Sequence, residues 1–555
     1  MATEKPTIHI VGAGLAGSEC ALQLAAIGYS VVLIEMRDGV KSTPAHRGTD
    51  CAELVCSNSF GSLASTSAPG ELKWEAEQLG SRILQAAFDA RVPAGQALGM
   101  DRDVFARRVT EMIAAEPLIR IERRTVLSLD EVPRPCVIAT GPLTDGPLAS
   151  SMAEHFGDDF LYFFDAIAPI IAIDSVNMDV AWRADRWDKG TKDYINCPMT
   201  QEQYFAFIEA MKAAKKIESK EFEKDVLAEA MGASTVEGAV GVESSSAESA
   251  TPYFDGCMPI ETMLERGDMT PRFGPMSAKG LTDPRTGKWP FACVQLRQDN
   301  KAGTAYNIVG FQTKMAYADQ KRVFSMIPGL EDAEFLKLGS IHRNLYINSP
   351  KRLNPDLSSK RDPLLFFAGQ ITGVEGYFES TCMGLLVARF LNAKLTGRLN
   401  MHASNISEVA PPRASAFGSL LDAITDETRA EHFQPTNINF GHMPAVMDQN
   451  RKPGDRRHRP DKNARRRMQN ANARRAMEEW VVAEGFAAPA DRRTDVAAEE
   501  LRVITEAAKV AEEAQKVAFK AEQGATRAIR RDARIAAHAA SVTNAPLAAT
   551  QVSDS

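Results

Sequence analysis

The stretch that decides the fold lies near the N-terminus and reads Thr7-Ile8-His9-Ile10-Val11-Gly12-Ala13-Gly14-Leu15-Ala16-Gly17. Its mostly apolar start is typical of a buried strand, and three glycines follow at the spacing G-x-G-x-x-G. Gly12 allows a tight turn, Gly14 lets the backbone approach a pyrophosphate, and Gly17 lets a helix pack closely on the sheet. Glu35 ends the next apolar strand, where a carboxylate can accept hydrogen bonds from an adenosine ribose. The stretch therefore predicts a strand, helix and strand that bind a dinucleotide.

Two later segments favour FAD over NAD as that dinucleotide. Val137-Ile138-Ala139-Thr140-Gly141 resembles the strand-ending Ala-Thr-Gly of flavoproteins with two dinucleotide domains. Phe367-Ala368-Gly369-Gln370-Ile371-Thr372-Gly373 resembles their late glycine motif beside the ribityl chain, although most of them carry Asp at the position of Gln370. We expect the following residues to bind the cofactor: Gly12, Ala13, Gly14, Leu15, Ala16, Gly17, Glu35, Gly141, Gly369, Gln370, Ile371, Thr372 and Gly373.

The distance between these motifs indicates a discontinuous domain. The late motif is followed by a helical pattern from Tyr377 to Leu395, so two cofactor-facing units flank a long middle segment. We predict an α/β fold in which a Rossmann-like FAD-binding domain (residues 1–173 and 345–480) is interrupted by an inserted α+β domain (residues 174–344). Beyond residue 481 the chain is Ala-rich with charges spaced as in a solvated helix. We expect residues 481–555 to form an exposed helical, or partly disordered, extension.

Composition limits the class of protein. The 555 residues are 44% hydrophobic and 25% charged, which is typical of a globular chain with more than one domain. The net charge of -7 gives no global attraction for nucleic acid. No apolar run approaches the roughly 20 residues that span a bilayer, and no export signal is evident. The eight cysteines are scattered without a CxxC pair, so we expect reduced thiols and no metal site. These features predict a cytoplasmic protein without membrane contact or an obligate protein partner.

Further motif-like segments occur along the chain: Thr43-Pro44-Ala45-His46, Glu53-Leu54-Val55-Cys56-Ser57-Asn58-Ser59, Val92-Pro93-Ala94-Gly95, Asn196-Cys197-Pro198-Met199, Gly256-Cys257-Met258-Pro259-Ile260-Glu261, Gln295-Leu296-Arg297-Gln298-Asp299-Asn300 and Ala368 to Tyr377. They resemble segments of the bacterial folate- and FAD-dependent tRNA (uracil-5-)-methyltransferases and follow the family order across about residues 5 to 480. The chain departs from the family pattern at Gly48 and at Ser277-Ala278-Lys279. The resemblance implies methylation of the T-loop uridine of tRNA at C5. It also implies 5,10-methylenetetrahydrofolate as carbon donor and FAD reduced by NADPH or NADH.

That reaction needs an activated thiol, because uracil C5 is a poor nucleophile. A thiolate that adds at C6 turns C5 into an enolate carbon, which can attack a one-carbon electrophile. The resemblance implies Cys257 as this nucleophile and Cys56 as the second essential thiol and general base, both near the flavin N5. Pro259 is well placed as the first residue of a helix running to Arg266, whose positive end would lower the pKa of a preceding thiol. A cysteine without a catalytic role is usually a small, buried, apolar residue. We expect this of Cys20, Cys136, Cys293 and Cys382.

A basic segment is the candidate RNA contact. Residues 451–475 are rich in arginine, including Arg465, Arg466 and Arg467, and Arg297 and Arg343 could add to the same face. The alternative reading is a solvated helix surface without a ligand.

Other functions stay open at this point. A related flavoprotein family modifies wobble uridines with a partner GTPase, but its members carry Cys-Asn-Pro where this chain has Cys56-Ser57-Asn58, and they lack the segment around Cys257. Ribosomal RNA is an alternative substrate. A non-enzymatic, RNA-binding flavoprotein that senses redox state through Cys51 and Cys56 is another alternative, as is a plain NAD(P)H oxidase.

Overall fold

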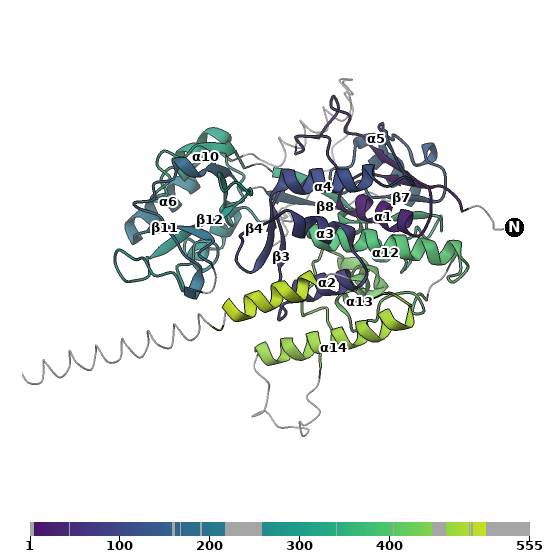
Figure 1. Cartoon of the computed structure of the whole chain (residues 1–555). Coiled ribbons are helices and arrows are strands. Elements are labelled where there is room, and N and C mark those ends of the chain that lie inside the picture. The colour runs from purple at the N-terminus through teal and green to yellow at the C-terminus, as the bar shows by residue number, and fades with distance from the viewer. Residues whose placement is uncertain are drawn as a thin grey trace, which may run out of the picture.

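The computed structural model describes residues 5–43, 45–157, 161–166, 168–188, 191–216, 258–339, 341–402, 405–446, 462–487, 489, 492–504 and 506. Two sheets, each with its own buried apolar cluster, organise this part of the chain (Figure 1). The first cluster draws on residues 8–156 and 346–501, and the second on residues 171–330.

The first sheet is parallel and has the strand order β16-β7-β1-β2-β6. Its strands are β1 (Ile8–Val11), β2 (Val31–Glu35), β6 (Ile119–Arg123), β7 (Cys136–Ile138) and β16 (Leu365–Phe367). Helix α1 (Leu15–Ala26) connects β1 to β2 and packs along α12 (Tyr377–Leu395). Such a parallel sheet, covered by crossover helices, is the predicted Rossmann-like α/β core, and the prediction is confirmed.

The second sheet is antiparallel and has the order β10-β11-β12-β13-β9-β14. Helices α6 (Gln201–Ala213), α8 (Ile260–Glu265) and α10 (Tyr317–Phe324) contribute buried residues to its apolar cluster, and Figure 1 shows it beside the parallel core. Its strands are β9 (Ile170–Ala172), β10 (Trp182–Arg183), β11 (Tyr194–Met199), β12 (Ala292–Gln298), β13 (Ala305–Ile308) and β14 (Phe335–Lys337).

Two smaller strand groups complete the sheets of the described residues. The chain enters and leaves the second sheet through β8 (Leu161–Ala166) and β15 (Ile341–Tyr346), which pair antiparallel along their whole length. A second group joins β3 (Ser59–Ser62), β5 (Ala97–Met100) and β4 (Arg91–Val92). The domain boundaries at residues 173/174 and 344/345 stay predictions.

The remaining helices cover the parallel core or connect strands. Among them, α2 begins after Ser67, whose hydroxyl accepts a hydrogen bond from the Gly70 amide and so caps the helix. They are α2 (Ala68–Gln78), α3 (Arg82–Asp89), α4 (Arg102–Ala114), α5 (Gly146–Phe156), α9 (Thr270–Phe273), α11 (Ser349–Arg352), α13 (Ala416–Thr425) and α14 (Lys462–Ala483), with 3-10 turns at Leu129–Glu131, Ile173–Ser175, Arg186–Asp188, Gln370–Thr372 and Glu427–His432. None of the helices in the described ranges is both long and apolar enough to cross a membrane.

The first part of the C-terminal extension packs onto the parallel core. Residues 493–504 are helical, and Ala497 and Leu501 are buried in the first apolar cluster. The Thr494 amide donates to the Glu77 carboxylate at 3.2 Å, and Arg493 pairs with Asp89 at 2.7 Å. The expectation of an exposed appendage is therefore wrong for these residues, because Ala497 and Leu501, four positions apart, lie on one face of the helix and pack on the core. Residues 507–555 lie outside the described residues.

Candidate functional site

The glycine turn at residues 12–17 has the stereochemistry that its sequence predicts. Gly12 has a φ of +101°, and a Cβ there would lie 2.5 Å from the Ala139 carbonyl oxygen. A Cβ on Gly17 would lie 1.9 Å from the Gly12 carbonyl oxygen, so the close approach of α1 to the turn requires glycine. A Cβ on Gly14 would meet nothing within 4 Å. Gly14 therefore leaves open room at the N-terminus of α1, where unpaired amides favour a phosphate.

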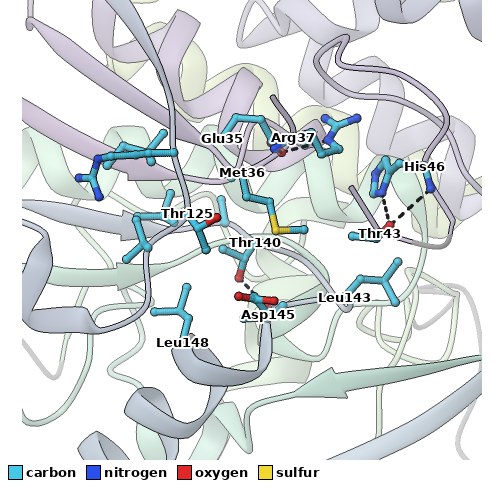
Figure 2. A pocket seen from close by; sticks show the side chains of 18 residues that line it. Glu35, Met36, Arg37, Thr43, His46, Thr125, Thr140, Leu143, Asp145 and Leu148 are labelled. Carbon is cyan, nitrogen blue, oxygen red and sulfur yellow. Dashed lines mark hydrogen bonds and ion pairs between the residues drawn. The ribbon is translucent and has the colours of Figure 1, made fainter. Parts of the chain in front are cut away.

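A cleft opens over this turn, and Figure 2 shows its side chains. The buried Glu35 carboxylate accepts hydrogen bonds from the Ala13 amide at 2.8 Å and from the Arg37 guanidinium at 3.0 Å. Burial by itself raises the pKa of Glu35, but Arg37 and these hydrogen bonds outweigh it and lower the pKa. An ionised acceptor thus lies at the end of β2. The lining consists of Val11, Gly12, Gly14, Ile34, Glu35, Met36, Arg37, Thr43, His46, Arg124, Thr125, Val126, Ala139, Thr140, Leu143, Thr144, Asp145 and Leu148.

These residues fit the adenosine and pyrophosphate portion of a dinucleotide. The helix N-terminus at Gly14 suits phosphates and the Glu35 carboxylate suits ribose hydroxyls, while the buried Arg37 guanidinium is paired with Glu35 and Glu53. A Cβ on Gly141 would also meet nothing within 4 Å, so the loop after β7 leaves open room.

The late glycine motif packs directly on the first one. Gly369 follows β16 with a φ of +85°, and a Cβ there would lie 2.8 Å from the Ala16 Cβ. Gln370, in the short 3-10 turn after it, donates from Nε2 to the Glu375 carboxylate at 3.0 Å. Because β1, β7 and β16 are parallel neighbours, the turns that follow them meet at one edge of the sheet. The structure thus brings together the three predicted cofactor segments around Gly12, Gly141 and Gly369.

Cys56 lies beside the end of the late motif. Its amide donates to the Tyr377 hydroxyl oxygen at 2.6 Å, and Tyr377 is the first residue of α12. Among the seven described cysteines Cys56 alone is half-exposed, whereas the other six are buried. Burial raises the pKa of Cys136 to about 12 and that of Cys293 to about 12. The predicted burial of Cys20, Cys136, Cys293 and Cys382 is confirmed.

Cys257, the second predicted thiol, lies outside the described residues. The chain is described again from Met258, and α8 begins at Ile260. Pro259 is the N-cap, with φ −56° and ψ 141°, and not the first helical residue as predicted. The prediction was wrong by one position because proline fixes φ but leaves ψ free to be extended.

Comparisons with known proteins identify the family. The family model described as "Glucose inhibited division protein A" matches residues 7–399. A protein of Bdellovibrio bacteriovorus, "Methylenetetrahydrofolate--tRNA-(uracil-5-)-methyltransferase TrmFO", is 62% identical over 479 residues, which cover 86% of this chain and 99% of that protein. The chain belongs to the TrmFO family. It is therefore an enzyme.

The TrmFO-family chain is also similar to a second protein in sequence and to a solved structure in fold. The protein of the same name from Rhizorhabdus wittichii is 49% identical over 477 residues, which cover 85% of this chain and 98% of that protein. In fold, a crystal structure of Aquifex aeolicus GidA has a TM-score of 0.52 at 13% identity, covering 77% of this chain and 68% of that one. The latter likeness concerns the fold alone.

The five predicted RNA-binding arginines do not share one setting in this TrmFO-family chain. Arg465 and Arg467 are exposed on α14, whereas Arg466 lies 5.2 Å from the centroid of the Phe440 ring. Arg297 donates from Nη2 to the Ser57 hydroxyl at 3.1 Å, its Nε is buried, and burial lowers its pKa. Arg343 lies in β15, and its side chain is outside the described residues. The RNA contacts stay predictions, and burial of Arg297 between the two cores does not favour a phosphate contact.

Two cations that were not predicted from the sequence donate hydrogen bonds to the segment around Cys56. Arg102 donates to the Leu54 and Cys56 carbonyls at 2.8 and 2.9 Å, and it pairs with Asp299 at 3.1 Å. Lys337 donates to the Val55 carbonyl at 3.1 Å. Burial, together with the nearby charges of Arg102 and Arg47, lowers the pKa of Lys337 to about 8. No local pattern marks these residues; only Asp299 falls within a segment that carries the family resemblance.

Proposed function

We propose that this chain is a cytoplasmic enzyme that methylates C5 of the T-loop uridine of tRNA. Its carbon donor is 5,10-methylenetetrahydrofolate, and its flavin, FAD, is reduced by NADPH or NADH. Folate-dependent methylation of uracil in tRNA is the activity in its relatives' name. The hydrogen bond from the Cys56 amide to the Tyr377 hydroxyl carries the proposal, because it joins the one half-exposed thiol of the described residues to the glycine motif expected beside the flavin.

The cofactor-binding residues divide between the two ends of the dinucleotide. The turn from Gly12 to Gly17 and the first amides of α1 would bind the pyrophosphate, and Glu35 would accept from the ribose hydroxyls. Gly141 and the segment from Gly369 to Gly373 would line the ribityl chain and the flavin ring. When bound, FAD supplies hydride and carries the one-carbon unit.

Each of the two thiols, Cys257 and Cys56, has a separate role in the reaction at the uracil ring. The Cys257 thiolate adds to C6, which places negative charge on C5 and lets this carbon form a bond to the one-carbon electrophile. Cys56, as general base, then removes the C5 proton while the bond between the one-carbon unit and its carrier breaks, which leaves a methylene group double-bonded to C5. Hydride, which reduced FAD would supply, converts this methylene into a methyl group. The electron pair of the methylene double bond moves into the C5–C6 bond as the Cys257 sulfur leaves C6, which regenerates the Cys257 thiolate. The Tyr377 hydroxyl fixes the backbone from which the Cys56 side chain projects.

Isotope transfer tests the proposed reaction. The holoenzyme is incubated with unmodified tRNA, reduced nicotinamide and methylenetetrahydrofolate labelled in its methylene group, and 5-methyluridine is measured in T-loop fragments. Cys257→Ala and Cys56→Ala should keep bound FAD and lose the product, because each lacks one reacting thiol. Cys51→Ala, which changes a buried neighbour, is the control and should stay active. Label elsewhere in tRNA, label in ribosomal RNA only, or normal product from Cys257→Ala contradicts the proposal.

The exposed arginines of α14 are the proposed phosphate contacts. Charge-mediated RNA binding weakens with salt, by roughly one unit of log-log slope for each phosphate contact. Replacing Arg465 and Arg467 together by Gln should therefore reduce the salt slope of tRNA affinity by about two. Arg466→Gln, which changes a residue packed on Phe440, should alter the slope less. Equal slopes for the wild type and the double variant would contradict this contact.

A further inference from the structure

Three successive backbone carbonyls around Cys56 accept hydrogen bonds from cationic side chains. Arg102 donates to Leu54 and Cys56 from its two terminal nitrogens, and Lys337 donates to Val55 between them. Residues 54–58 form neither helix nor strand, so their polar groups require partners from elsewhere in the chain. Charged donors make shorter and stronger hydrogen bonds than neutral ones, so this segment is held more firmly than a water-bonded loop.

The two cations come from different cores. Arg102 is the first residue of α4, in the parallel core, and Lys337 is the last residue of β14, in the antiparallel sheet. Asp299, directly after β12, is buried and accepts from both Nε and Nη2 of Arg102, at 3.1 Å each. The guanidinium is thus fixed in a fork and cannot rotate away from the carbonyls without breaking the pair.

The residues after Cys56 are tied across the same junction. The Asn58 side chain is buried and donates to the carbonyls of Met100 and Gln298, at 3.1 and 3.0 Å. With Tyr377 on the Cys56 amide, the segment is fixed from α12, α4 and two strands of the second sheet. The backbone that bears the thiol therefore has its position set by both cores together.

We infer that Arg102 and Lys337 are positioning residues for the Cys56 thiol. The inference rests on the proposed function, in which Cys56 acts on the C5 proton. Proton transfer requires close and aligned contact, so a thiol displaced by about 1 Å loses rate far more than it loses substrate affinity. An ordinary interface ion pair would contribute to stability alone.

Arg134 provides a matched control. Its guanidinium also pairs with an aspartate, Asp362, at 2.7 Å, and donates to two backbone carbonyls, those of Leu129 and Val132. It makes these contacts within the parallel core, and none of these three partners belongs to the Cys56 segment. Arg134→Lys and Arg102→Lys therefore each remove a guanidinium that joins one aspartate to two backbone carbonyls, in two different places.

Steady-state kinetics of the holoenzymes separate positioning from stability. Arg102→Lys should lower kcat by about tenfold or more, with the KM values for tRNA and folate within about threefold, because a lysine reaches one carbonyl and leaves the loop less well aligned. Arg134→Lys should leave kcat and both KM values near those of the wild type. Equal kcat for the two variants would overturn the inference, as would a loss in Arg102→Lys that lies in KM alone.

A second pair of variants decides the matter if Arg102→Lys does not retain FAD. Lys337→Met keeps an unbranched chain in place of the half-buried lysine stem and removes the ammonium, whereas Lys337→Arg keeps a charged donor. Lys337→Met should lower kcat several-fold and speed amide hydrogen exchange in residues 54–58, and Lys337→Arg should restore both toward the wild type. Unchanged kcat and exchange in Lys337→Met would overturn the inference.

Failure of the inference and failure of the proposed function give different results. If Cys56→Ala is inactive while Arg102→Lys and Lys337→Met keep full kcat, the role of Cys56 stands and the positioning role falls. If Cys56→Ala forms 5-methyluridine at the wild-type rate, the proposed role of Cys56 itself falls.

Discussion

The glycine cradle at residues 12–17 and the Cys56 segment at residues 54–58 are built in opposite ways. The cradle is made by a contiguous strand, turn, helix and strand, and its Glu35 carboxylate is bonded to Ala13, 22 residues away. The Cys56 segment has no regular structure, and its partners Arg102, Lys337 and Tyr377 lie 46, 282 and 321 residues from the groups they bind. One site is specified by local stereochemistry, whereas the other forms only when both cores are folded and in contact.

The two sites should therefore respond differently to substitution. Steric exclusion defines the cradle, because an added methyl group collides with backbone that has no freedom to move. Hydrogen bonds define the Cys56 segment, so loss of a partner leaves a buried polar group unsatisfied while the packing stays intact.

The largest expected effect is in the cradle. Gly17→Ala should prevent stable folding, at a cost of more than about 4 kcal/mol, because its Cβ would lie 1.9 Å from the Gly12 carbonyl oxygen. Gly14→Ala, where the Cβ meets nothing within 4 Å, should fold with the wild-type melting temperature and bind FAD weakly. Thermal unfolding of the apoproteins and flavin content after purification measure the difference. A folded Gly17→Ala variant with full flavin content would show that the cradle is not sterically defined.

The same contrast explains how much the sequence reveals. The turns that contain Gly12, Gly17 and Gly369 could be predicted because glycine at a strand end or at a close helix approach is a local signal, while the contacts of these residues with FAD stay predictions. Arg102 and Lys337 could not, since an arginine at a helix start and a lysine at a strand end are ordinary surface residues until the fold brings them to Cys56. Arg297 shows the same limit: its charge predicted an RNA contact, which stays a prediction, and the sequence does not reveal that tertiary packing buries its Nε beside the Cys56 segment.

A smaller effect is expected at the junction of the two cores. Asn58→Ala should lower the free energy of unfolding by about 2 kcal/mol, because the carbonyls of Met100 and Gln298 lose a buried donor. Asn354→Ala is the control: that side chain also makes two hydrogen bonds, to Ser358 and Ser359, but it lies within one core and is half-exposed. Urea unfolding should show a larger loss for Asn58→Ala. Equal losses would mean that the junction contributes nothing beyond an ordinary amide pair.

The helix at residues 493–504 packs on the same core as the glycine cradle, although it is distant from the cradle in sequence. Leu501→Ala should destabilise the protein by about 1 to 2 kcal/mol, since Leu501 is 9% exposed at the edge of the first apolar cluster. Val503→Ala, in the same helix but 53% exposed, should change stability by less than about 0.5 kcal/mol. Thermal melts of the two holoenzymes would separate them. Indistinguishable melting temperatures would restore the view of this helix as an appendage.

The smallest effect concerns a buried carboxyl on α2 that contacts α14 across 403 residues. Burial raises the pKa of Glu71 to about 7, although Arg474 lies 3.0 Å away and opposes the shift. Between pH 4.5 and 7 the folded state thus binds more protons than the unfolded state, and this group's contribution to stability falls as the pH rises through that window. Glu71→Gln should remove that fall and gain about 1 kcal/mol at pH 8 relative to pH 5, after loss of the Arg474 pair. Urea unfolding at both pH values, with the exposed Glu479→Gln as control, tests the sign. A Glu71→Gln variant that loses more stability at pH 8 than at pH 5 would mean that the ion pair with Arg474 outweighs the cost of burial. This contact between α2 and α14 would then stabilise the core through charge, as Arg102 and Lys337 stabilise the Cys56 segment.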